Sequence, residues 1–430
     1  MVTVLQIKQM VSQAYFGDAV MTETDYSRGR KLFIAEGCCA NGVVTLTTGA
    51  FLSGYAGYLG ADDSLNGIIG SIPVLLCTLQ MFSSVVLENL RQKKFLIACF
   101  ALIHRLLLSS VFFVPLVVED NAGRLVAVVA IYVVAHFFGA FIGTGTGSWL
   151  LSLVPENIRG TYLGRKDAFA FAFTTVLSLL CGRILDWMRG AHQDLLGYYI
   201  IGLIVLSTAF TDFWCLSSIR EPVQETHRRS LKAAVIDPLL DREYRKVIGL
   251  YMFWNLALQV AGPFFSVYMV TGLSLDYTYI TFLGLIASSV RVVAACFWGR
   301  LADATSWLHA ARCSMLLLGL VHTSWLFMTP ATCLILQPIL QALSGAAWGG
   351  IAIAVFSLQY QYAPADKRVT YVSASYAGLC GFFATLLGAS LLKILPEFSV
   401  GGFKVSGMQM IFALSGVLIM LCVRYMRRLK

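Results

Sequence analysis

Long apolar runs recur along the whole sequence and are separated by short polar stretches. A helix needs about 20 apolar residues to cross a bilayer, and about twelve runs reach this length. They cover approximately residues 32–59, 66–87, 95–118, 125–151, 163–186, 195–216, 246–272, 277–300, 312–329, 334–358, 370–394 and 408–425. The runs lack the alternation of barrel strands, and a backbone in lipid has to satisfy its own hydrogen bonds. The sequence therefore predicts an all-α integral membrane protein with twelve transmembrane helices.

The few charged residues, 13% of the chain, predict how these helices are oriented. Most of the 32 lysines and arginines fall in the two tails and in the loops after the even-numbered runs. This bias places both termini on the cytoplasmic side of the cell inner membrane. The net charge of +9 then reflects the topology and the anionic lipids of the inner leaflet, and gives no reason to expect nucleic-acid binding. Residues 1–30 lack the apolar core of a signal peptide.

An internal repeat predicts that the chain consists of two related halves. The polar break at residues 155–162 returns at residues 364–371, with Pro, Arg, Thr and Tyr at identical spacing. Such repeats are common in transporters. The expected parts are a cytoplasmic tail (1–30), a six-helix bundle (31–216), a cytoplasmic linker (217–245) and a second six-helix bundle with a short basic tail (246–430).

The loop after the eighth run carries a recognisable motif. Residues 299–303 read Gly-Arg-Leu-Ala-Asp, and with twelve runs in two halves the chain resembles the major facilitator superfamily. The resemblance implies two pseudo-symmetric bundles around a central cavity that opens alternately to each side. It also implies that runs 1, 4, 7 and 10 line this cavity, while runs 3, 6, 9 and 12 stay outside. The Gly-Pro pattern that drug exporters of this family carry in the fifth run is missing here.

Polar and aromatic residues in the middle of the runs are the candidates for substrate binding. Amides donate and accept hydrogen bonds, indoles stack on ligand faces, and a cation at this depth needs a counter-charge or a wet cavity. The alternative for each is a polar side chain satisfied between helices. The candidates are Asn41, His136, Trp254, Asn255, Gln259, Arg291, Gln341 and Trp348.

Two of the intramembrane residues are candidates for proton coupling. Glu36 lies about one turn inside the first run, and His136 lies in the fourth, with a reference pKa of about 6.5. The alternative for Glu36 is a salt bridge with a nearby arginine. Arg105 lies on the third run, outside the expected cavity, so a structural partner such as Asp212 is favoured for it.

Charged residues at the cytoplasmic ends of the runs form a candidate gate. Acidic groups near helix N-termini and facing arginines can hold this side closed and release it when the bundles move. The alternative is that the basic residues only enforce topology. The candidates are Glu88, Arg91, Arg159, Arg300, Asp303 and Arg368.

The predicted function is secondary active transport. No Walker loop, nucleophile elbow or metal-ligand spacing is present, so no enzyme, cofactor or metal site is expected. We expect a monomer that takes up a small polar organic solute, such as a sugar or oligosaccharide, together with protons. Proton-driven efflux of amphipathic compounds or drugs is one alternative, and a membrane sensor that does not transport is another.

Overall fold

The structure is a computed structural model, and it divides into two compact units. It describes residue 15 and residues 21–222, 231–362, 377–395, 397–400 and 403–426. Unit 1 comprises residues 1–48 and 79–231, and unit 2 comprises residues 49–78 and 232–430. The outer part of the first apolar run and the first part of the second therefore pack with the C-terminal half of the chain.

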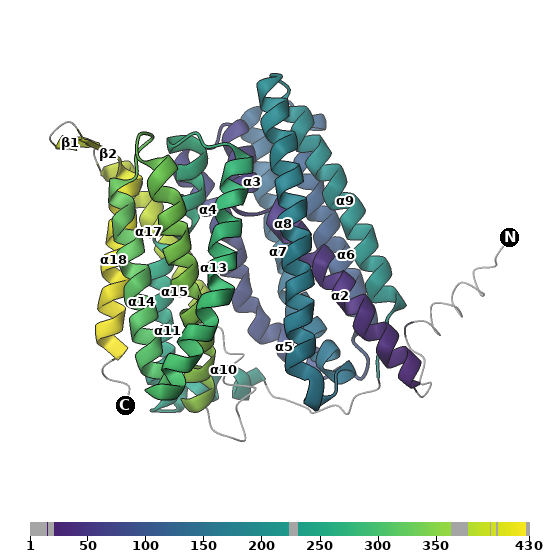
Figure 1. Ribbon diagram of the computed structural model, residues 1–430. Helices are drawn as coiled ribbons and strands as arrows, with labels where there is room; N and C mark the ends of the chain where they lie inside the picture. Colours follow the sequence, from purple (N-terminus) through teal and green to yellow (C-terminus); the bar gives the residue numbers. More distant parts are fainter. Residues whose placement is uncertain are drawn as a thin grey trace. The chain divides into compact units, whose positions relative to one another are not determined.

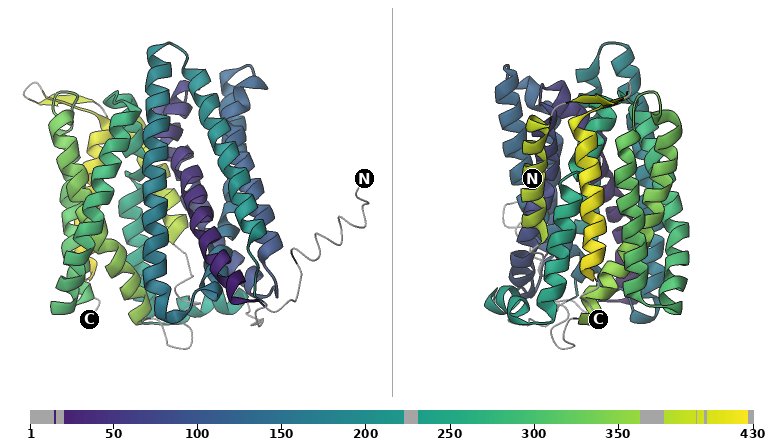
Figure 2. Two further views of the ribbon diagram at one scale, coloured as in Figure 1. Left: turned by 45° about the vertical axis from the view of Figure 1, so that its right-hand side comes forward. Right: turned by 90° about the vertical axis from the view of Figure 1, so that its left-hand side faces the viewer.

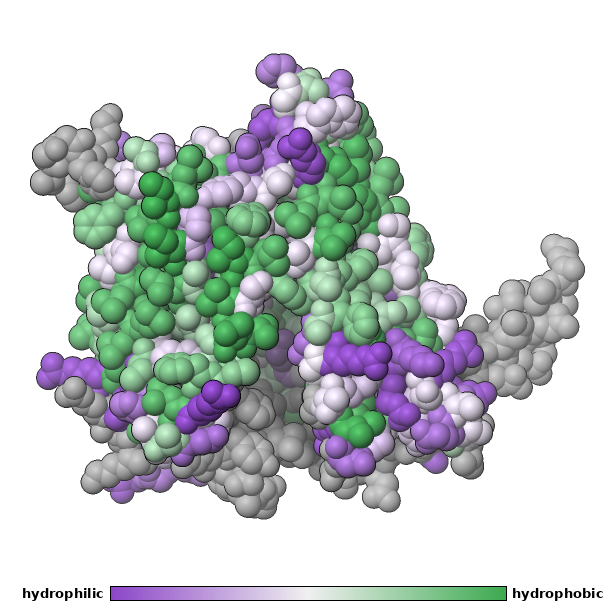
Figure 3. Space-filling model, in the orientation of Figure 1, coloured by the Kyte–Doolittle hydropathy of each residue, from purple (hydrophilic) through white to green (hydrophobic). Residues whose placement is uncertain are grey.

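The described residues confirm an all-α multi-pass membrane protein. Eleven helices are long and apolar enough to cross a membrane, and a shorter apolar helix covers Gly378–Ile394. The first residues of the predicted run 370–394 and the second copy of the polar break lie outside the described residues. In the space-filling view, hydrophobic residues cover the middle of the helices in each unit, and hydrophilic residues gather towards their ends (Figure 3).

The described part of unit 1 is built from six helices, two of which start at short polar side chains. Thr22 and Asp120 are N-caps whose side chains accept hydrogen bonds from the first turn. The helices are α2 (Glu23–Leu46), α5 (Gln80–Glu88), α6 (Lys94–Ser110), α7 (Asn121–Leu153), α8 (Arg159–Gly190) and α9 (Asp194–Ser218), with 3-10 turns at Val111–Leu116 and Glu156–Ile158. They are labelled in Figure 1.

Unit 2 contains the remaining helices and one hairpin. The helices are α3 (Gly49–Tyr58), α4 (Asp63–Leu76), α10 (Leu231–Leu240), α11 (Tyr244–Gln259), α12 (Gly262–Val267), α13 (Tyr277–Ala304), α14 (Trp307–Ser324), α15 (Cys333–Tyr362), α17 (Ala377–Ile394) and α18 (Gly407–Tyr425). Helical turns follow at Cys77–Leu79, Tyr268–Gly272 and Trp325–Phe327, and β1 (Phe398–Val400) pairs antiparallel with β2 (Phe403–Val405). Figure 2 shows α18, coloured yellow, running beside the other helices of this unit.

Three predicted runs are interrupted rather than continuous. In the first, α2 ends at Leu46 and α3 begins at Gly49, whose φ of +57° is a conformation that favours glycine. The second contains Pro73 and a 3-10 turn between α4 and α5. The seventh is divided into α11 and α12 by residues 260–261, and α12 begins with Gly262 and Pro263. Hydropathy does not detect such breaks because the residues around them are as apolar as the helices.

Close helix contacts in unit 2 depend on small residues. A Cβ atom at Gly345 of α15 would overlap the carbonyl oxygen of Ala287 in α13, and one at Gly349 would lie 2.8 Å from the carbonyl oxygen of Arg291. The aromatic core beside them includes Phe265 and Phe412, which stack with ring centroids 4.2 Å apart. These contacts join α15 to α13 and α12 to α18, and α12 and α15 are two of the helices that line the cavity described next.

Candidate functional site

The interruption between α11 and α12 leaves backbone carbonyl groups in the membrane region without their helical donors. Pro263 has no N–H to give to the carbonyl of Gln259, and the Thr385 hydroxyl donates to that oxygen instead at 2.9 Å. The N–H of Ala261, which would bond to Ala257 in a continuous helix, bonds to the carbonyl of Leu258. The carbonyl of Ala257 accepts a hydrogen bond from the Ser415 hydroxyl at 2.6 Å. Hydroxyl groups of α17 and α18 thus satisfy the carbonyl groups of the interrupted segment.

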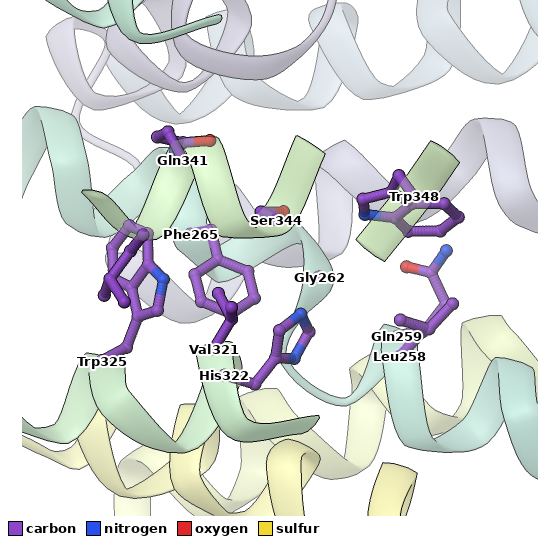
Figure 4. A pocket seen from close by; sticks show the side chains of 11 residues that line it. Leu258, Gln259, Gly262, Phe265, Val321, His322, Trp325, Gln341, Ser344 and Trp348 are labelled. Atoms are coloured by element: carbon purple, nitrogen blue, oxygen red, sulfur yellow. The ribbon is translucent and has the colours of Figure 1, made fainter. Parts of the chain in front are cut away.

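A cavity of about 290 Å³ lies beside this interruption, within unit 2. It is lined by α11 and α12, by the end of α14 with the turn that follows it, and by α15. The lining residues are Leu258, Gln259, Gly262, Phe265, Val321, His322, Trp325, Leu340, Gln341, Ser344 and Trp348. Gln259 and Trp348 lie at one end and Gln341 and Trp325 at the other, with Ser344 and His322 between them (Figure 4).

The lining is mostly apolar and carries a few polar groups without formal charge. None of the eleven lining residues is a Lys, Arg, Asp or Glu. The side-chain amides of Gln259 and Gln341 and the hydroxyl of Ser344 make no hydrogen bond within the described part of the chain. They can therefore donate to and accept from a solute. The indoles of Trp325 and Trp348 offer flat apolar faces.

His322 lines the cavity, and contacts with Ser415 and Phe265 hold its side chain in place. Its side chain is nearly buried, with 7% exposed. The Nδ1 atom lies 2.9 Å from the hydroxyl oxygen of Ser415 in α18. The imidazole also meets the ring of Phe265 edge-on, with ring centroids 4.8 Å apart. The orientation of the imidazole is therefore fixed by two neighbouring helices.

Unit 1 contains a second candidate group, a buried cluster of charged residues. Arg105 Nη1 of α6 lies 2.6 Å from Asp212 Oδ2 of α9, and Arg105 Nη2 lies 3.7 Å from Glu36 Oε1 of α2. The exposed fractions of these side chains are 4%, 0% and 8%. Lys166 of α8 approaches the same region, with its Nζ atom 2.9 Å from where a Cβ atom on Gly37 would lie. The two cations balance the two carboxylates.

Two histidines lie next to this cluster. His104 is buried, and neither of its ring nitrogens has a hydrogen-bond partner within the described residues. Its ring centroid is 5.4 Å from that of His136, which in turn packs edge-on against Tyr132 at 4.4 Å. The Tyr132 hydroxyl donates to the carbonyl of Thr47, where α2 ends. The histidine pair thus connects the charge cluster to the interruption in the first run.

Comparison with protein families decides the class of the molecule. A model described as Major Facilitator Superfamily matches residues 33–389. The chain belongs to the major facilitator superfamily. The protein is accordingly a membrane transporter and not an enzyme. A comparison with curated protein sequences gave no match.

Solved transporter structures share the fold of this protein. A bacterial homologue of the iron transporter ferroportin in the inward-facing state is 14% identical with a TM-score of 0.68, covering 95% of this chain and 99% of that one. The nucleoside transporter NupG is 10% identical with a TM-score of 0.66, covering 94% and 100%. The inward-open xylose transporter XylE from E. coli is 14% identical with a TM-score of 0.61, covering 94% and 95%. At these identities the likeness concerns the fold alone.

The fold brings three of the predicted substrate-binding residues together at the cavity. Gln259 of α11 and Gln341 and Trp348 of α15 line it. Trp254 is 5% exposed and packs against Trp348 with ring centroids 6.3 Å apart, so it supports the cavity wall from outside. His136 lies in unit 1 next to the charge cluster.

The other predicted substrate residues lie away from the cavity lining. Asn41 is exposed on α2 and donates to the carbonyl of Gly37, while Asn255 is half-buried and donates to that of Tyr251. These bonds to the preceding turn satisfy one donor of each amide. Arg291 is exposed on α13 and makes no ion pair within the described residues.

The predicted gate residues are only partly described. Arg91, Arg300 and Asp303 are exposed, and the latter two lie in the last turns of α13. Arg159 is half-buried at the start of α8. The side chain of Glu88 and the whole of Arg368 lie outside the described residues.

Sequence reasoning missed His322, Trp325, Phe265 and Ser344 as lining residues. His322 lies on the ninth run, which the resemblance assigned to the outside of the cavity. Two signals in the sequence pointed to the site, namely the Gly-Pro pair at residues 262–263 and a histidine in the middle of an apolar run. The expected ion pair of Arg105 with Asp212 is present, and so is the alternative of a salt bridge between Glu36 and an arginine.

Proposed function

We propose that the protein is a secondary active transporter that takes up a small polar organic solute together with protons. In this proposal it works as a monomer in the cell inner membrane, by alternating access of two bundles and with both termini in the cytoplasm. The solute binds in the cavity of unit 2, and the charge cluster of unit 1 responds to the proton. Asp303, Arg300, Arg159, Arg91, Glu88 and Arg368 act in the cytoplasmic gate.

The single observation that carries the substrate class is the presence of polar but uncharged groups in an otherwise apolar cavity wall. Amide and hydroxyl groups face a space with no charged residue in its wall, and indoles lie at both ends. A volume of about 290 Å³ lies near the lower end of the range for small-molecule sites, about 300–1,000 Å³. These properties favour a monosaccharide-sized solute over an oligosaccharide. The fold is shared with transporters of xylose and of nucleosides, which are themselves neutral and rich in hydroxyl groups.

The coupling part of the proposal depends on the charge cluster. Arg105 lies nearest to Asp212 and farther from Glu36, so one arginine interacts unequally with two buried carboxylates. Protonation of one carboxylate changes the charge balance of the cluster and therefore the relative energies of two helix arrangements. Because these groups join α2, α6 and α9, such a change would act on three helices together.

Transport assays in oriented vesicles test this function. Right-side-out vesicles with an imposed inward proton gradient are expected to accumulate a neutral monosaccharide-sized solute, and a protonophore is expected to abolish the accumulation. Accumulation only in inverted vesicles would contradict uptake. Binding of the solute without flux in either orientation would instead support the sensor alternative.

Efflux of amphipathic compounds is the second candidate, and one observation favours it. Three aromatic side chains, Phe265, Trp325 and Trp348, contribute to the cavity wall and could hold an apolar compound. Inverted vesicles with a fluorescent amphipathic dye supplied outside distinguish the two candidates. Proton-driven dye uptake in these vesicles, without sugar uptake in right-side-out vesicles, would establish efflux.

A further inference from the structure

A chain of two hydrogen bonds behind the cavity determines which nitrogen of His322 carries its hydrogen. The Ser415 hydroxyl lies 2.6 Å from the carbonyl oxygen of Ala257, and that oxygen can only accept. This carbonyl needs an outside donor because the interruption of the seventh run directs the N–H of Ala261 to Leu258. The single hydrogen of the Ser415 hydroxyl is therefore used for Ala257.

The second hydrogen bond follows from the first. His322 Nδ1 lies 2.9 Å from the Ser415 oxygen, whose hydrogen already points to Ala257. The ring nitrogen must then be the donor, so the hydrogen is on Nδ1. In a neutral imidazole the other nitrogen, Nε2, carries a lone pair and accepts. It makes no hydrogen bond within the described residues, while the ring lines the cavity.

The surroundings of His322 favour a neutral imidazole. Its neighbours in the cavity are Phe265, Val321 and Trp325, together with the uncharged Gln341 and Ser344. No carboxylate lines the cavity to stabilise an imidazolium, and an isolated charge is costly at such a site. Nε2 of His322 is therefore an acceptor that cannot donate, whereas the side chains of Gln259, Gln341 and Ser344 can do both.

We propose that His322 is a specificity-determining residue that accepts a hydrogen bond through Nε2 from a hydroxyl group of an uncharged polyhydroxy solute. Ser415 acts as its positioning residue, because it holds the ring in the Nδ1–H form. This inference rests on the proposed transport function and narrows its substrate class. A solute whose corresponding position only accepts leaves Nε2 without a partner and binds more weakly.

The tautomer can be measured without any ligand. Nitrogen-15 spectra of the histidine-labelled protein contain signals from six histidines, and the signal lost in His322→Asn identifies His322. We expect an unprotonated Nε2 and a protonated Nδ1 in the wild type, with a mixture of both forms in Ser415→Ala. A protonated Nε2 in the wild type would overturn the inference.

Binding experiments test the role of the acceptor. The probes are D-glucose and D-xylose as neutral polyhydroxy compounds, lactate as an anion and choline as a cation. We expect the neutral probes alone to bind the wild type. An analogue with fluorine in place of the contacting hydroxyl accepts but does not donate, and we expect it to bind about 10-fold or more weakly. Preferential binding of lactate or choline, or no binding of either sugar, would overturn the proposed class.

Matched substitutions of His322 distinguish the roles of its two ring nitrogens. In His322→Asn the amide can still donate to Ser415 but does not reach the cavity, so the hydroxyl and fluoro probes should bind equally weakly. In His322→Gln an amide oxygen can take the place of Nε2, so the preference for the hydroxyl should be partly retained. His309→Asn, an exposed position on the same helix, is the control and should behave as wild type. Wild-type selectivity in His322→Asn would overturn the inference.

Different results would contradict the role of His322 and the transport function. If a sugar is transported and His322→Asn leaves its affinity and its selectivity over the fluoro analogue unchanged, the role of His322 is wrong while transport stands. If sugars bind and their binding depends on His322, but no flux occurs in either vesicle orientation, transport is wrong while the binding role stands.

Discussion

Arg105 of α6 and Asp212 of α9 form an ion pair in which Nη1 and Oδ2 are 2.6 Å apart and both side chains are almost completely buried. Glu36 of α2 lies 3.7 Å from the other terminal nitrogen of the same arginine. Three helices of unit 1 therefore meet at one guanidinium. Removing Arg105 takes the counter-charge from two buried carboxylates, whereas neutralising Glu36 leaves the Arg105–Asp212 pair in place, and this difference determines the first two predictions.

Replacing Arg105 by methionine should strongly destabilise the protein. Two buried carboxylates would lose their counter-charge, and removing one partner of a buried pair costs about 3–5 kcal/mol. Thermal unfolding in detergent measures the effect. Lys246→Met is the matched control, because its pair with Glu243 is exposed and such pairs contribute about 0–1 kcal/mol. Equal losses in the two variants would contradict a structural role for the buried pair.

Replacing Glu36 by glutamine should uncouple transport from protons. The amide keeps the size of the carboxyl group but does not titrate, so exchange of solute across the vesicle membrane should continue while accumulation driven by a pH gradient is lost. Glu23→Gln is the control on the same helix, since the Glu23 side chain is 83% exposed. Gradient-driven accumulation at the wild-type level in Glu36→Gln would assign Glu36 to the salt bridge alone.

Replacing Gly262 by alanine should weaken solute binding with little loss of stability. The new Cβ atom would lie 2.9 Å from Oε1 of Gln259, the flexible end of a side chain that can move away. We expect affinity to fall by about 10-fold, roughly the value of one displaced hydrogen bond. Binding isotherms of the neutral probes measure this change. Gly284→Ala, where a Cβ atom meets nothing within 4 Å, should keep wild-type affinity.

Glu221 should make stability depend on pH. Its carboxylate accepts hydrogen bonds from the backbone N–H groups of Lys93 and Lys94 at 2.8 and 2.7 Å. Burial raises the pKa of Glu221 above its usual value, although these two N–H donors act in the opposite direction. The folded state then holds the proton more tightly than the unfolded state. The resulting stability is complete below the usual pKa of about 4.3 and is lost as pH rises through the raised value.

Thermal unfolding at a series of pH values checks this sign. Wild type should lose stability relative to Glu221→Gln as pH rises from about 4 through the raised pKa, because glutamine does not titrate. Glu243→Gln, at a side chain that is 62% exposed, is the control and should follow the wild-type profile. Parallel profiles for wild type and Glu221→Gln would show that burial does not control this carboxyl group.

Part of the candidate site could be predicted from the chemistry of single residues. A buried arginine needs a carboxylate, so Arg105 predicted a partner such as Asp212. Amides and indoles on the seventh and tenth runs predicted Gln259, Gln341 and Trp348, all of which line the cavity. The same reasoning did not exclude Trp254, because two indoles on neighbouring helices look alike in a sequence although one lines a cavity and the other packs behind it.

The sequence by itself determined the membrane class, the helical fold and the family, because long apolar runs, sparse charge and a loop motif are local properties of the chain. Only the tertiary structure decided where the helices break, which residues share a cavity and which histidine meets it. His322 became a candidate because α14 places it in the wall of the cavity and Ser415 of α18 holds it in place. The physical reason is that hydropathy records how apolar a segment is, whereas the direction of one side chain depends on which helices pack around it.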